Sequence, residues 1–434
     1  MKKIFLILCI LFSLTTYAES NSDYLNINFW QKFNDDKLLE NLTIAYNNNH
    51  DLKAAVLKVQ EAQRVVKLSF ANELPYFGFE GYIGQTFKSS DERFGHEVIP
   101  DFTQSHFLLP LNMNYEIDIW QENRLKTKSK KKQFEMIKQD ERSTYILITS
   151  ALACDYYNLI RIDKLIEYQN ELINLSEQIL YSQQRKYELG TATKTEIEEA
   201  QKNLTYLKEE LLKLKEKQDV LENQMNVILA DRSFNEIKRK DFSDISFNME
   251  IPEKINFEVL EKRPDRIKSE LELEKKGIDI KIAKKDFLPK FYLTGNLGFN
   301  MYNLHTAHKF LADIGVIPVF DIFAGGKKVQ NLKLKKDEYE IAIQHYEKII
   351  LKSMQETNDA LYSLKTAAKI INITDERKET DIKELNYTEL KKEAGTKDNL
   401  DILIQKQKLI LSQKQEVSAK INEIISSINL YQAL

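Results

Sequence analysis

Two stretches of the chain alternate apolar and polar side chains with the two-residue period of a β-strand. In residues 289–301 the apolar side chains stand mostly at odd positions and the polar side chains at even positions. The chain returns through Ile314, Val316 and Pro318, so residues 289–324 are predicted to form a β-hairpin. Each strand would have about a dozen residues, whereas a tilted strand needs only roughly 9–11 residues to cross a bilayer. This hairpin is therefore predicted to span a membrane.

Residues 75–120 carry the same pattern and predict a second membrane hairpin. The polar side chains expected to face a water-filled lumen are Asn112, Asn114, Glu116, Tyr292, Thr294 and Asn296. Four strands cannot close a barrel, and each backbone group left unpaired in lipid costs several kcal/mol. Strands from several chains must therefore combine. A soluble sheet with one wet face would alternate in the same way, but the strand length and the N-terminal sequence favour a membrane.

Long helices account for most of the remaining chain. Between Asn123 and Leu189 there is no Pro or Gly, and an apolar residue recurs at every seventh position from Tyr145 to Tyr187. At 1.5 Å per residue such a helix is on the order of 100 Å long, and the seven-residue repeat predicts coiled-coil-like packing. Gly190 ends the helix, and Thr193 or Thr195 begins a returning one. A long helical hairpin with its turn at Gly190 is predicted.

The same order of elements occurs twice. Pro75 and Pro289 are 289 − 75 = 214 residues apart, Asp118 and Asp321 are 321 − 118 = 203 apart, and Gly190 and Gly395 are 395 − 190 = 205 apart. We interpret this spacing as a two-fold internal repeat. The predicted divisions are a signal peptide 1–18, an N-terminal segment with short helices 19–74, a β-hairpin 75–120, a helical hairpin 121–230, a connector 231–262, a helix 263–288, a β-hairpin 289–324, and a second helical hairpin with the C-terminus 325–434.

Composition and the N-terminus agree with an exported, mainly helical protein. The chain has 434 residues with only 12 Gly and 7 Pro, and its net charge of −3 gives no reason to expect nucleic acid as a partner. Residues 1–18 combine two lysines, a short apolar run and the small-residue pattern ending at Ala18, as in a cleaved secretory signal. Leu8 precedes Cys9 where a lipidation site needs a small residue, so we expect no lipid anchor. The mature chain would keep one cysteine, Cys154, and no disulfide.

Five stretches together resemble the TolC-type outer-membrane efflux proteins, and among them the OprM-like branch. They are Trp30-Gln31-Lys32-Phe33, Tyr115-Glu116-Ile117-Asp118-Ile119-Trp120, Lys186-Tyr187-Glu188-Leu189-Gly190, Arg263-Pro264-Asp265, and the run from Pro318 to Gly326. The family usually has glycine after the segment that ends at Trp120, whereas this chain has Gln121. A glycine is then either not needed at this turn, or the turn has another shape.

The resemblance implies a homotrimer in the outer membrane of a Gram-negative bacterium. Its 12-stranded β-barrel would continue into a periplasmic α-barrel, and its partners would be outer-membrane lipid, a periplasmic adaptor and an inner-membrane pump of the RND, ABC or MFS type. The residues implied to dock the adaptor lie at two helical turns and are Tyr187, Leu189, Gly190, Thr191, Ala394, Gly395 and Thr396. The two glycines could instead serve only to end helices with positive φ.

The resemblance also implies a gate near the second turn. The family's apolar gate position falls on Leu400, whereas its acidic position falls on Ile404, so Asp398 or Asp401 would have to supply the charge. Each acid could equally be a solvated residue at a helix start. The implied function is the passive exit duct of a tripartite efflux system. An export duct for a type I polypeptide secretion system and a periplasmic coiled-coil structural protein are the alternatives.

The sequence offers little support for an enzyme, a metal site or a cofactor. His305 and His308 are three residues apart but have no evident third ligand. Gly325-Gly326-Lys327-Lys328 lacks the spacing and the Ser or Thr of a phosphate-binding loop. The transported substrate is not encoded in any motif, so drugs, metal ions, dyes, fatty acids and peptides all stay open.

Overall fold

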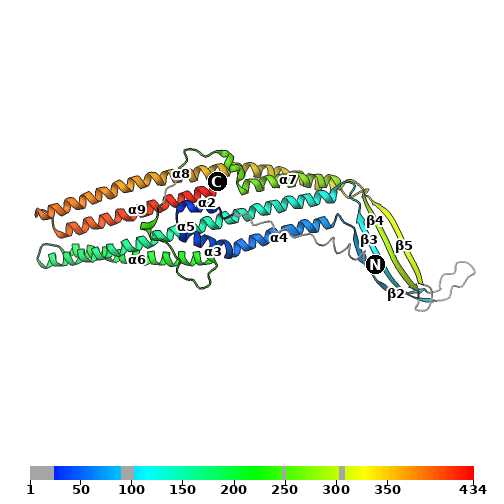
Figure 1. Ribbon diagram of the computed structural model, residues 1–434, viewed down its shortest axis with the longest axis horizontal. Helices are drawn as coiled ribbons and strands as arrows, with labels where there is room; N and C mark the ends of the chain where they lie inside the picture. The colour runs from blue at the N-terminus through cyan, green and yellow to red at the C-terminus, as the bar shows by residue number, and fades with distance from the viewer. Residues whose placement is uncertain (1–23, 89–101, 247–250, 303–307) are drawn as a thin grey trace, which may run out of the picture. The chain divides into compact units, whose positions relative to one another are not determined.

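The computed structural model describes residues 24–88, 102–246, 251–302 and 308–434 (Figure 1). The predicted signal peptide with Cys9, and also His305, lie outside these residues. The helices are α2 Ile27–Trp30, η1 Gln31–Phe33, α3 Asp36–Asn48, α4 His50–Ala71, α5 Glu122–Glu188, α6 Lys194–Leu229, η2 Phe242–Asp244, η3 Phe257–Lys262, α7 Pro264–Lys285, α8 Lys327–Glu393 and α9 Asn399–Ala433. The strands are β1 Tyr76–Phe79, β2 Tyr82–Lys88, β3 Phe102–Glu116, β4 Lys290–Tyr302 and β5 His308–Val319.

The described residues divide into two compact units. The first contains the described residues up to Ala55 together with those of Glu141–Leu260 and Ser353–Leu434, and the second contains those of Val56–Asp140 and Glu261–Lys352. In the first unit the helical segments lie side by side in the order α8, α9, α5, α6 (Figure 1). Side-chain contacts agree with this order, because Glu416 of α9 binds Lys378 of α8 and Gln218 of α6 binds Asp163 of α5.

The core of the first unit lies where the N-terminal segment covers the long helices. Trp30, Leu38 and Leu42 are fully buried there against Tyr156 of α5 and Ile428 of α9. The Tyr156 hydroxyl lies 3.1 and 3.0 Å from the two carboxylate oxygens of Asp35 and donates to this carboxylate, so these two buried polar groups are paired. Burial of these large apolar side chains stabilises the packing of the N-terminal segment on one face of the helical layer.

Both long helical hairpins turn at a glycine with a left-handed backbone. Gly190 has φ 75° and Gly395 has φ 73°, a conformation that glycine adopts without steric cost. Thr193 begins α6 with a capping box that includes Glu196, so Thr193 rather than Thr195 is the restart. Asn49 rather than Asp51 caps α4, because the Asn49 side chain accepts from the backbone N–H groups of Asp51 and Leu52 at 2.9 and 3.0 Å.

In the second unit the strands form one antiparallel sheet in the order β1-β3-β4-β5, with β2 also pairing with β3. The first predicted strand is interrupted at Glu80 and Gly81, although β1 and β2 keep one register on β3. Ile117 donates to Phe291 on the β4 side, so the even residues of β3 direct their backbone groups toward β1 and β2. Pro110 is one of these and has no N–H to donate, which breaks the ladder opposite Glu80.

Two predicted strands are shorter than expected. The alternating pattern extended through Ile119 and Ile322, but β3 ends at Glu116 and β5 ends at Val319. Asp118 explains the first ending, because its carboxylate accepts from the backbone N–H groups of Asn123 and Arg124 at 3.2 and 3.0 Å. A residue that caps the following helix cannot also continue the strand.

The turn after Trp120 has the backbone shape that a glycine would adopt. Gln121 has φ 61°, which lies in the left-handed region, and its side chain is exposed. The corresponding turn before α8 contains Gly325 and Gly326, with φ 58° and 78°. Of the two explanations for the missing glycine, the structure therefore favours a turn of ordinary shape that carries a strained residue.

We predict that Gln121→Gly stabilises the protein. The left-handed conformation costs a residue with a Cβ roughly 1–2 kcal/mol, and the extra freedom of glycine in the unfolded chain offsets about half of this. The expected gain is about 1 kcal/mol, measured as a higher urea midpoint of the helical circular dichroism signal. Gln121→Ala keeps a Cβ and should not show the gain. A midpoint for Gln121→Gly at or below that of Gln121→Ala would contradict the strain.

Candidate channel lining and hairpin tips

All six residues predicted to line a lumen lie on one face of β3 and β4. They stand directly opposite one another as the pairs Asn112 and Asn296, Asn114 and Thr294, and Glu116 and Tyr292. The polar face continues onto β5, because Asn296 Nδ2 donates to Asp313 Oδ2 at 3.0 Å. Amides, hydroxyls and carboxylates at this density form a surface that prefers water to hydrocarbon.

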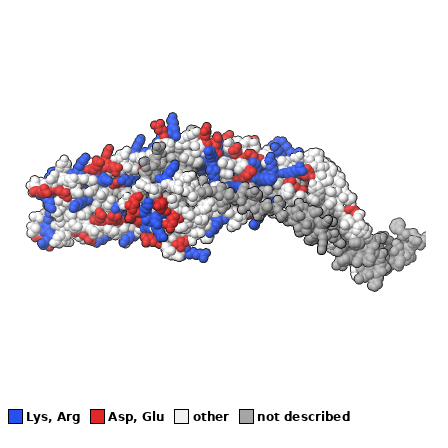
Figure 2. All heavy atoms as spheres, in the orientation of Figure 1, with Lys and Arg blue, Asp and Glu red and all other residues white. Residues whose placement is uncertain are grey.

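The other face of the same sheet is apolar and largely uncovered. It includes Phe77 of β1, Leu297 of β4, and Ile314 and Val316 of β5, and Ile314 is 74% exposed. Figure 2 shows charged side chains of both signs along the helices, whereas the visible surface over β5 is mostly free of them. An exposed apolar face of this extent belongs against lipid or another protein surface.

Charged side chains fix the start of α5 to the start of β4. Lys290 Nζ lies 3.0 Å from Glu122 and 3.7 Å from Glu116, and Lys126 also pairs with Glu122 at 2.5 Å. Burial alone would raise the pKa of Glu122, but the hydrogen bonds from the two lysines outweigh it and hold that pKa below its usual range. Trp120 Nε1 adds a bond to the Pro289 carbonyl at 2.7 Å.

The two hairpin tips have the same local structure. The backbone N–H and hydroxyl of Thr191 donate to the Lys186 carbonyl at 2.9 and 3.0 Å, and Thr396 makes the same two bonds to Lys391. The residues predicted to dock an adaptor therefore sit on two matching turns. Of these, Leu189 is 78% exposed, so the first tip presents an apolar side chain to its surroundings.

The acids predicted as gate residues cap α9. Asp398 accepts from the Asp401 backbone N–H at 3.0 Å, and Asp401 accepts in return from Asp398 at 3.0 Å and from Lys397 Nζ at 2.8 Å. Asp398 also pairs with Lys186 of α5, and this hydrogen bond is the main cause that lowers the pKa of Asp398. Leu400 is half-buried beside them, and Ile404 is exposed.

The pairing of Lys186 with Asp398 was missed from the sequence. It joins the ends of the two helical hairpins, across 398 − 186 = 212 residues. Farther along the same seam between α5 and α9, Arg161 binds Asn422 at 3.1 Å and Gln169 binds Lys414 at 2.7 Å. The sequence held no signal for this pair, since the internal repeat aligns Lys186 with Lys391 and not with an acid.

Within the described ranges, no three His, Cys, Asp or Glu side chains are grouped to hold a metal ion, and His308 begins β5. Burial raises the pKa of the Cys154 thiol to about 12, so this thiol stays protonated. None of the described helices combines the length and the apolar character required to cross a bilayer.

Comparison with known proteins identifies relatives that are named for efflux. Residues 41–230 and 257–434 match the sequence profile described as "Outer membrane efflux protein". The chain is 23% identical to the toluene efflux pump outer membrane protein TtgC of Pseudomonas putida, over 93% of this chain and 84% of TtgC. It is 22% identical to the cation efflux system protein CusC of Escherichia coli, over 78% of this chain and 73% of CusC.

A solved structure has the same fold. The Campylobacter jejuni CmeC outer membrane channel matches with a TM-score of 0.83 at 21% identity, over 96% of this chain and 90% of CmeC. The family profile covers most of the chain, in both halves, and includes every strand and long helix described above. This chain is therefore a member of the outer membrane efflux protein family.

Proposed function

We propose that this protein is the outer-membrane exit duct of a tripartite efflux system, which conducts solutes passively while an inner-membrane pump supplies the energy. The observation that carries the proposal is the two-faced sheet, with paired polar residues on one face of β3 and β4 and exposed apolar residues on the other. An aqueous pore through lipid needs this division. TtgC and CusC are named for toluene and for cations, so family membership leaves the solute open.

A homotrimer with a 12-stranded barrel best accounts for the sheet edges. Within the described residues, β5 lies at one edge of the sheet, and β1 and β2 occupy the other. Counting β1 and β2 as one interrupted strand, each chain supplies four strands. Joining the β5 edge of one copy to the β1 edge of the next forms a ring in which no backbone group is left unpaired in lipid.

The helical layer of the first unit supports the same assembly. Its two outer helices, α6 and α8, carry exposed large apolar side chains along their lengths. These include Tyr206, Leu212 and Val220 of α6, and Tyr362, Tyr387 and Leu390 of α8. An α-barrel would bring α8 of one copy against α6 of the next and remove these side chains from water.

The hairpin tips are proposed to form both the gate and the adaptor-docking surface. The ion pair between Lys186 and Asp398 links the two hairpins of one chain at their ends, beside the half-buried Leu400. Moving one hairpin tip away from the other requires breaking this pair. Since the pKa of Asp398 is lowered, the pair is intact at neutral pH and is lost as the pH falls through that lowered value.

We predict that Asp398→Asn opens the channel. Asparagine caps a helix about as well as aspartate, so the start of α9 is kept while the ion pair with Lys186 is removed. Planar-bilayer recordings of the purified trimer should show a severalfold higher open probability, and Leu400→Ser should act in the same direction. Asp401→Asn is the control, because it removes an acid from the same turn without touching Lys186. Equal recordings for Asp398→Asn and the wild type would remove this pair from the gate.

A second prediction concerns docking at the first tip. Leu189→Asp replaces an apolar side chain that is already exposed, so folding and trimer formation should be unchanged while adaptor contact is lost. The measurement is the yield of periplasmic adaptor cross-linked to the tagged protein in cells, which should fall at least about tenfold. Leu68→Asp makes the same change at an exposed position of α4. Undiminished adaptor capture by Leu189→Asp would contradict docking at this tip.

A further inference from the structure

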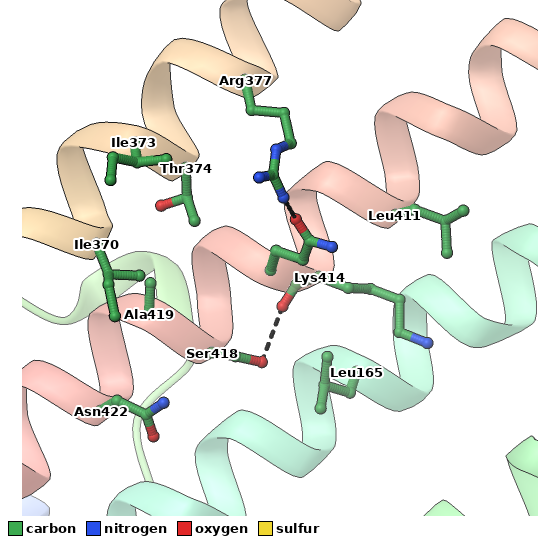
Figure 3. A pocket seen from close by; sticks show the side chains of 11 residues that line it. Leu165, Ile370, Ile373, Thr374, Arg377, Leu411, Lys414, Ser418, Ala419 and Asn422 are labelled. Atoms are coloured by element: carbon green, nitrogen blue, oxygen red, sulfur yellow. Dashed lines mark hydrogen bonds between the residues drawn. The ribbon is translucent and has the colours of Figure 1, made fainter. Parts of the chain in front are cut away.

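A groove of about 670 Å³ lies between α5, α8 and α9 in the first unit (Figure 3). Its volume falls within the roughly 300–1,000 Å³ range of small-molecule sites. Isoleucines from α8 and leucines from α5 and α9 form its apolar part, and amide, hydroxyl and cationic side chains form the rest. The residues that line the groove include Leu165, Ile370, Ile373, Arg377, Leu411 and Lys414.

The apolar part of the groove is not the core of the unit. Ile421, Ile424 and Ile428 of α9 are buried beneath the N-terminal segment, whereas the groove lies on a different face of the same helix. Ile370, Ile373 and Leu411 are 44%, 55% and 49% exposed. These side chains would gain from an apolar molecule that displaces water from the groove.

Two cations, Arg377 and Lys414, line the groove, and a third, Arg161, binds the lining residue Asn422; among the described residues all three donate to neutral amides. Arg161 donates to Asn422 at 3.1 Å, Lys414 donates to Gln169 at 2.7 Å, and Arg377 donates to Gln415. In the part of the chain that the structure describes, none of the three has a carboxylate within ion-pair distance. The acid next along α9 is already occupied, because Glu416 binds Lys378 at 2.8 Å and Lys420 at 2.6 Å.

Burial lowers the pKa of Arg161 and of Lys414, and the distant carboxylate of Glu210 on α6 offsets only part of the effect on Lys414. An anion placed between Arg377 and Lys414 would supply charge-assisted hydrogen bonds that neutral amides cannot match. Figure 3 shows Arg377 extending from α8 toward α9 and Lys414 extending from α9 toward α5, with Ile370 and Ile373 on the α8 side of the groove.

We propose that this groove binds an amphipathic organic anion. The apolar body of the ligand would lie on Ile370, Ile373 and Leu411, and its carboxylate or sulfonate would bind Arg377 and Lys414. The proposal rests on the proposed function in one respect, since it makes such anions solutes that contact the tunnel wall during passage. One side of the groove is formed by α8, which is also an outer helix of the layer, so a loss of trimer in groove variants would show that a neighbouring copy occupies the groove.

The test uses two probes that share one apolar body. The anion 8-anilinonaphthalene-1-sulfonate carries a sulfonate, and N-phenyl-1-naphthylamine is the same ring system without it. Fluorescence titrations of the full-length trimer in nanodiscs should give a saturable site for the sulfonate, with about tenfold weaker binding in Arg377→Gln and in Lys414→Gln. Binding of the uncharged probe should change less than twofold. Lys369→Gln is the matched control, because Lys369 is exposed on α8 outside the groove.

Three results would overturn the proposal. The first is sulfonate binding that Arg377→Gln and Lys414→Gln leave unchanged, and the second is an equal loss in Lys369→Gln. The third is a loss of trimer in the groove variants, because it would assign the groove to a neighbouring copy. Bilayer conductance of the same samples separates this test from the proposed function. A conducting trimer without the sulfonate site contradicts the groove alone, whereas a wild type that does not conduct contradicts the duct.

Discussion

The hydrogen-bonding requirement of β-strands in lipid is the constraint on which the rest of this structure depends. Backbone groups at a sheet edge cannot bind water inside a bilayer, and each unpaired group costs several kcal/mol. Within the described residues, the sheet has one polar face, one exposed apolar face and two open edges. Family membership assigns the protein to the outer membrane, and the proposed trimer satisfies the edges there.

The junctions between strands and helices show how local chemistry serves that arrangement. Asp118 ends β3 by capping α5, and Lys290 holds Glu122 at the first turn of the same helix. Gln121 occupies the left-handed turn between them at some cost in stability. A chain that must change from a strand to a helix of 67 residues over so few positions gains rigidity from each of these contacts.

Much of the fold could be predicted from the sequence because it depends on periodic patterns. The two-residue period placed Asn112 and Asn296, and Glu116 and Tyr292, on one face, and the structure pairs them directly. Helix lengths followed from the absence of Pro and Gly up to Gly190. The strand ends were wrong because alternation continues through residues, such as Asp118, whose side chains prefer to cap a helix.

The candidate site was less predictable because its contacts join distant parts of the chain. Asp398 could be named from the resemblance, but its partner Lys186 lies on another helix, and no local pattern connects the two. The groove depends likewise on three helices, and its uncompensated cations are recognised only when the positions of all nearby carboxylates are known. Helix caps are also hard to assign from the sequence. Asn49 and Asp51 are equally suitable residue types for the N-cap of α4, and only the backbone geometry shows that Asn49 is the cap.

Cross-linking across the proposed seam between copies tests the central claim most directly. In the predicted repeat, Asp313 corresponds to Pro110 (313 − 203 = 110) and Gly84 corresponds to Gly298 (84 + 214 = 298), and Pro110 and Gly298 pair within the chain. The variant Gly84→Cys with Asp313→Cys, in a Cys154→Ser background, should therefore be joined between copies by a short bifunctional thiol reagent in outer membranes. The account predicts bands of one, two and three chains, and no cross-link when either cysteine is omitted. Products that remain monomeric, or that extend beyond three chains, would contradict the closed trimer.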